Sequence, residues 1–173
     1  MSKQLAKKYE DIEDVKNQFL QKVANISDDV FNQKPDDGSW SLAQVFYHIY
    51  FVEFGTITTI NKNLKADKVK LNAGISNVFR SLLLKIILKS PFKFKAPKVV
   101  SEVPAQISLQ EIKDMFGKNT QAFKVVLTDL PEALENKQIF KHPLAGLFTI
   151  NETLHFVREH YLHHEMQIDR LLK

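Results

Sequence analysis

Two histidines near the end of the chain have the spacing of a metal-binding pair. The segment 149–172 reads TINETLHFVREHYLHHEMQIDRLL. As a helix, it places His160 and His164 one turn apart on a face shared with Val157, Tyr161 and Ile168. Imidazoles at positions i and i+4 can bind one metal ion from the same side. Two core histidines, each satisfied by a hydrogen bond, are the alternative interpretation.

A third histidine favours the metal interpretation. His48 lies in the segment 41–64, on an apolar face with Val45 and Ile49. Three imidazoles and one water suit tetrahedral zinc; they also suit nickel and, less typically, iron or manganese. Gln167 follows His164 by three residues and could orient a ligand or the bound water. We therefore predict one divalent ion at the three histidines.

The remaining candidates are less well placed for chemistry. His142 is expected in a loop that could overhang the site, and His163 should flank it. No general base is apparent, since the carboxylates nearest in sequence point away from the histidine face. They are Glu53, Glu152 and Glu159. Tyr161 occupies the position at which a zinc protease of the HExxH type has its glutamate, which argues against that class.

Apolar periodicity and capping residues predict four long helices near 3–25, 41–64, 108–130 and 150–172. Segment 74–88 should form a shorter amphipathic helix, with Val78, Leu82 and Ile86 on one line. A proline-containing crossover then leads to the third long helix. No strand is expected, and 131–148 is interpreted as an ordered loop. The fold class is therefore all-α, a four-helix bundle forming a single domain over 1–173.

Composition restricts the chemistry and the partners. The 173 residues include no cysteine, which excludes disulfides and cysteine-ligated metals. No run of about 18 apolar residues and no signal peptide is seen, so a cytoplasmic protein without membrane partners is expected. Residues 61–100 hold ten basic side chains and one acid. We interpret these as solubilising an apolar segment rather than binding nucleic acid or an anionic surface.

Four stretches together resemble the DinB-like superfamily of metal-binding helical proteins. They are WSLAQVFYHI at 40–49, the KAP…P connection at 95–104, HPLAGLF at 142–148 and HYLHHEMQI at 160–168. The resemblance implies an up-up-down-down bundle whose metal-binding histidines correspond to His48, His160 and His164.

The same resemblance also indicates which functions to expect. It implies a thiol-dependent transferase, which would use a low-molecular-weight thiol, or a metal-dependent hydrolase acting on a small molecule. A non-catalytic metal-binding stress or interaction protein is the alternative. Family members commonly dimerise, and the apolar line through Leu82 would need a partner surface, so a homodimer is expected.

Overall fold

The computed structural model describes residues 1–66, 70–72, 103–142 and 145–173. The shorter helix expected at 74–88 and most of the crossover lie outside the described residues. Within the described part of the chain, no helix is both long and apolar enough to cross a membrane.

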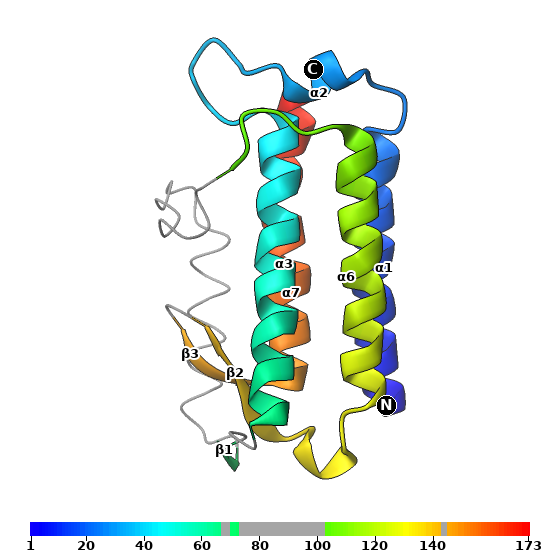
Figure 1. Cartoon of the computed structure of the whole chain (residues 1–173), viewed down its shortest axis with the longest axis vertical. Helices are drawn as coiled ribbons and strands as arrows, with labels where there is room; N and C mark the ends of the chain where they lie inside the picture. The colour runs from blue at the N-terminus through cyan, green and yellow to red at the C-terminus, as the bar shows by residue number, and fades with distance from the viewer. Residues whose placement is uncertain (67–69, 73–102, 143–144) are drawn as a thin grey trace.

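Four long helices make up most of the described chain, and they lie side by side along its long axis (Figure 1). They are α1 (Lys3–Lys22), α3 (Leu42–Lys65), α6 (Leu109–Thr128) and α7 (Ile150–Leu171). The predicted helices are thus confirmed to within three residues at each end. Each helix begins after a Ser or Thr whose hydroxyl accepts a backbone N–H, and α3, α6 and α7 begin with complete capping boxes.

The long helices form two pairs. Contacts are most extensive between α3 and α6 and between α1 and α7. In Figure 1 the pair α3–α6 lies in front of the pair α1–α7. Aromatic side chains fill the space between them: Phe116 of α6 packs on Phe46 of α3 and on Tyr161 of α7. The two pairs therefore share one continuous core.

The helices are parallel within each pair and antiparallel between pairs (Figure 1). Lys8 of α1 bonds to Asn151 at the start of α7, and Lys22 bonds to Asp169 at the other end. Along the chain the order is up, down, down, up, so the expected up-up-down-down order is wrong. The short connection between α1 and α3, which contains α2 (Asp28–Asn32), reverses the chain. Only the long connection from α3 to α6 allows two consecutive helices to run parallel.

A small antiparallel sheet precedes α7, although no strand was predicted. β1 (Lys70–Asn72), β2 (Lys137–His142) and β3 (Gly146–Thr149) pair in the order β1-β2-β3. A 3-10 turn at Glu132–Leu134 leads into β2. Gly146 has φ 84°, a left-handed conformation that favours glycine at the turn between β2 and β3. The interpretation of 131–148 as a loop is therefore wrong.

The sheet is tied to the helices at the end remote from α2. The side-chain amide of Asn63, near the end of α3, donates to the carbonyl of Ile139 in β2 at 2.8 Å. β3 then runs directly into α7, whose cap is Thr149. The hairpin thus defines where α7 begins.

Candidate metal centre

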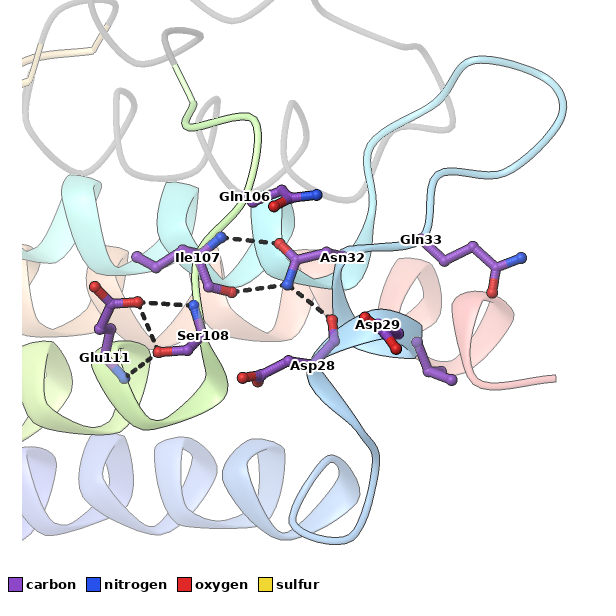
Figure 2. Close-up of a pocket in the computed structure, with 9 residues that line it drawn as sticks. Asp28, Asp29, Asn32, Gln33, Gln106, Ile107, Ser108 and Glu111 are labelled. Carbon is purple, nitrogen blue, oxygen red and sulfur yellow. Dashed lines mark hydrogen bonds between the residues drawn. The ribbon is translucent and has the colours of Figure 1, made fainter.

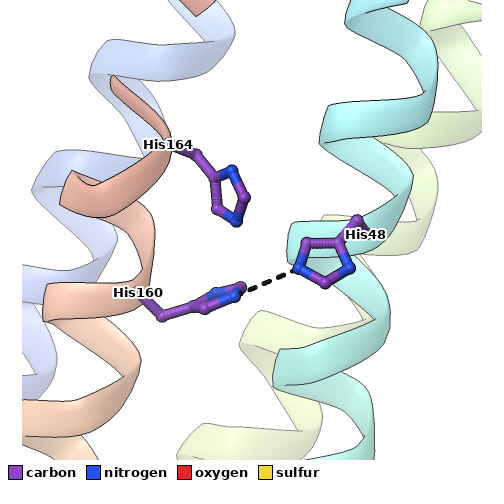
Figure 3. A group of neighbouring side chains, drawn as sticks. All are labelled: His48, His160 and His164. Carbon is purple, nitrogen blue, oxygen red and sulfur yellow. Dashed lines mark hydrogen bonds between the residues drawn. The ribbon is translucent and has the colours of Figure 1, made fainter. Parts of the chain in front are cut away.

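Three histidines from two helices converge in the core (Figure 3). His48 projects from α3 toward His160 and His164 of α7. The Nε2 atoms of His48 and His160 are 3.2 Å apart. One ring nitrogen from each histidine lies within 4.8 Å of the other two. The structure therefore brings together the three residues proposed from sequence as ligands.

The cluster is shielded by aromatic side chains. His48, His160 and His164 are exposed by only 5%, 9% and 7%. The Trp40 ring lies 5.2 Å from the ring of His48, and Phe156 lies 5.9 Å from His160. Neither aromatic residue was predicted from the sequence to belong to the site. The signal available in the sequence was the position of Trp40 directly before Ser41, which caps the start of α3.

Burial keeps the imidazoles of His160 and His164 neutral. Burial, together with the neighbouring His48, lowers the pKa of His164 to about 3. Burial, followed by the proximity of His164 and His48, also lowers the pKa of His160 well below its usual value. Neutral imidazole is the form that coordinates metal, so near neutral pH both rings are in the competent state.

A hydrogen bond sets the tautomer of His164. Its Nδ1 lies 2.9 Å from the Oε1 of Gln167. An amide oxygen can only accept, so Nδ1 carries the proton and Nε2 keeps a free lone pair. Ligating histidines commonly make such a bond with the nitrogen that does not face the metal. Gln167 therefore lies where it can hold the His164 ring in orientation.

The spacing of the nitrogens suits a coordinated ion. Zinc–nitrogen bonds of about 2.0–2.1 Å in a tetrahedron place neighbouring nitrogens about 3.3–3.4 Å apart. The observed 3.2 Å between His48 and His160 is close to this edge length. In the described part of the chain, no carboxylate or further histidine joins this group. Three imidazoles leave one tetrahedral position for an exchangeable molecule.

Neither His142 nor His163 belongs to this group. His142 is in β2 rather than in the expected loop, and it is buried. Its Nδ1 accepts the N–H of Ala145 at 3.1 Å, and its ring packs against Phe156 and Phe148. Burial lowers its pKa to about 4. His163 is exposed, with its ring 4.9 Å from that of His164.

The three carboxylates considered as general bases are engaged elsewhere. Glu53 is buried beside Lys16, with 3.1 Å between Oε1 and Nζ. Glu152 accepts the N–H of Thr149 in the capping box of α7. Glu159 pairs with Arg158 at 2.9 Å. This agrees with the expectation that they point away from the histidine face.

A surface pocket also lies between α2 and the start of α6 (Figure 2). Its polar groups largely satisfy one another. Asn32 exchanges two hydrogen bonds of 2.9 Å with the backbone of Ile107, and Asp28 accepts the N–H of Leu109. These bonds fasten α2 to the chain entering α6, so we assign this pocket a structural role.

Comparison with known proteins identifies a family for most of the chain. A sequence model described as the DinB superfamily matches residues 11–168. This range includes all three converging histidines and Gln167. No curated protein and no solved structure matched the chain.

Proposed function

The chain belongs to the DinB superfamily, and we propose that it is a metal-dependent member of that family with a four-helix-bundle domain. His48, His160 and His164 would hold one divalent ion. The observation that carries this proposal is the convergence of three buried ring nitrogens within 4.8 Å. Without an ion, each of these rings would need hydrogen-bond partners of its own in the core.

Zinc or nickel suits this ligand set best, and iron or manganese would also be accommodated. When bound, such an ion acts as a Lewis acid and makes a coordinating thiol or water more acidic. The residues around it supply the rest. Trp40 and Phe156 exclude bulk water, and Gln167 keeps His164 oriented.

We propose that the protein is a transferase that adds a low-molecular-weight thiol to a small electrophile. The second candidate is a hydrolase, in which water takes the place of the thiol. The engagement of Glu53, Glu152 and Glu159 in other contacts favours a thiol. A free thiol ionises with a pKa near 8.5. Water, in contrast, becomes a nucleophile near neutral pH only with the help of a metal and usually of a positioned base.

Cobalt substitution tests whether the centre has an open position. The metal-free protein would be loaded with one equivalent of Co²⁺, and its visible spectrum recorded before and after adding a low-molecular-weight thiol. We expect a new sulfur-to-cobalt charge-transfer band, together with conjugation of the thiol to a generic electrophile. An unchanged spectrum would contradict the proposal of an exchangeable position.

The alternative is a non-catalytic metal-binding protein. The burial of the histidines supports it, because a structural metal needs no access for substrate. The same experiment separates the two. A closed centre would bind Co²⁺ tightly, keep its spectrum in the presence of thiol and show no conjugating activity.

A further inference from the structure

A second polar group lies in the core, and it joins the two helix pairs. We call it the Lys16 cluster; its members are Glu13 and Lys16 of α1, Glu53 of α3, and Asn119 and Thr120 of α6. It was not anticipated from the sequence. The spacing of Leu5, Tyr9, Ile12, Lys16 and Phe19 nevertheless places Lys16 on the apolar line of α1.

Lys16 lies at the centre of the cluster. Its Nζ is 2.6 Å from Glu13 Oε1, 3.1 Å from Glu53 Oε1 and 3.0 Å from Thr120 Oγ1. The side chains of Lys16 and Glu53 are only 3% and 1% exposed. Lys16 belongs to the pair α1–α7, whereas Glu53 and Thr120 belong to the pair α3–α6. The ammonium group thus bridges the two pairs.

The other bonds complete the group. Asn119 donates to Glu53 Oε2 at 3.0 Å and to the carbonyl of Tyr50 at 3.1 Å. Thr120 donates to Glu13 Oε2 at 2.8 Å, which is a second bond between the pairs. Each contact requires one particular alignment of the helices along their axes.

Such a cluster contributes specificity more readily than stability. Removing charges from water is costly, and apolar residues of similar volume often replace buried ion pairs without loss of stability. Burial raises the pKa of the Glu53 carboxyl against the opposing effect of Lys16, which reflects that cost. The best-attested role of buried polar groups between helices is to set register.

The cluster lies about one and a half turns beyond His48 along α3. Glu53 follows His48 by five residues, about 7.5 Å along α3. In α7, Tyr161 follows His160 and packs against Phe19 of α1. A slip of one helical turn between the pairs, about 5.4 Å, would break the bonds of Lys16 and move His48 away from His160.

We propose that the Lys16 cluster sets the axial register between the two helix pairs and thereby positions His48 opposite His160 and His164. Its members are positioning residues and take no part in binding the ion. The consequence for metal affinity rests on the proposed function; the register itself does not.

A distance measurement on the metal-free protein tests the register. The chain has no cysteine, so spin labels can be attached at Phe54→Cys in α3 and Met166→Cys in α7, both exposed positions. We expect one narrow distance distribution. In the background Lys16→Met/Glu53→Leu/Thr120→Val, which removes the bonds of Lys16 and Thr120 between the pairs, the distance distribution should broaden or shift by up to about 5.4 Å, the length of one helical turn. The hydrogen-bonding pair Lys16→Gln/Glu53→Gln should restore the narrow distribution.

Lys22→Met is the matched control. Lys22 also leaves α1 to form ion pairs, but with Glu165 and Asp169 of α7, inside one helix pair. Its removal should leave the distribution unchanged. An unchanged distribution in the folded apolar variant would overturn the proposal. If that variant does not fold, Lys16→Met/Glu53→Gln/Thr120→Val, which keeps an acceptor for the amide of Asn119, replaces it under the same criterion.

Metal titration of the same variants gives the second readout. The apolar variant should bind Zn²⁺ at least tenfold more weakly than the wild type, whereas Lys22→Met should bind it equally well. Equal affinity in the apolar variant would overturn the positioning role. If the wild-type protein binds no metal, the proposed function fails, and the distance measurement still decides the register.

Discussion

The three histidine side chains are better suited to an ion than to one another. Without metal, the 3.2 Å contact between His48 and His160 is a single N–H···N bond, which requires one ring to donate and the other to accept. His164 directs its Nδ1 proton to Gln167, so its Nε2 lone pair also faces the group. A shared divalent ion would satisfy all three rings at once.

Gln167 should contribute to metal affinity without binding the metal. Replacing it by Leu removes the acceptor for His164 Nδ1 and frees the ring to rotate. We expect roughly a 10–100-fold loss in affinity for Zn²⁺, measured by competition with a chelator. Gln167→Glu retains an acceptor and should bind nearly as well as the wild type. If Gln167→Leu binds equally well, the hydrogen bond does not orient the ligand.

Trp40 should report metal binding directly. It is the only tryptophan in the chain, and its ring is centred 5.2 Å from that of His48. Ni²⁺ or Co²⁺ quenches a nearby indole, so fluorescence should fall and level off at one equivalent of either ion. His48→Ala should abolish this saturable quenching. Quenching that persists in that variant would place the ion elsewhere.

At the scale of elements, the sequence predicted the helices well because their signals are local. The capping boxes that begin α3, α6 and α7 need only residues three positions apart, such as Ser41 and Gln44. The hairpin was missed because its strands are short and lack alternation. Two short apolar runs, centred on Phe140 and Phe148 and separated by a glycine-containing turn, were the available signal.

The hairpin should make stability depend on pH through His142. The folded-state pKa of about 4 lies below the usual 6.5, so between these values the unfolded chain binds more protons. Stability should therefore fall as pH decreases from about 6.5 to 4, by up to about 1.4 kcal/mol per pH unit from this residue. Urea unfolding of the metal-free protein would measure this slope.

His142→Asn is the comparison for that slope. Its side-chain oxygen can still accept the N–H of Ala145, and it does not titrate in this range. The variant should be less stable at pH 7 but should lose less stability on acidification. If the unfolding free energies of the two proteins changed equally with pH, His142 would not be held neutral by burial.

At the scale of the whole molecule, function depends on how two helix pairs meet. The sequence indicated which residues face inward, but not the direction of each helix. The direction of each helix depends on the lengths of the connections. The long segment between α3 and α6 allows those two helices to run parallel. The bridge from Lys16 to Glu53 was also missed, because partners more than thirty residues apart share no local pattern.

The oligomeric state remains a prediction at this scale. The apolar line of Val78, Leu82 and Ile86 lies outside the described residues, and it motivates the expectation of a homodimer. Light scattering should then give about twice the 20.0 kDa mass of one chain. Replacement of Leu82 by Glu should return the protein to a monomer. A mass of one chain at high concentration would reject the dimer.

The most direct test of the metal centre is metal stoichiometry in histidine variants. Metal-free wild type and the variants His48→Ala, His160→Ala and His164→Ala would be titrated with Zn²⁺ and Ni²⁺, with His163→Ala as the exposed neighbouring control. We predict one tightly bound ion per wild-type chain, the same in His163→Ala, and loss of tight binding in each of the other three variants. Full occupancy in all three would contradict the assignment of His48, His160 and His164 as the metal ligands.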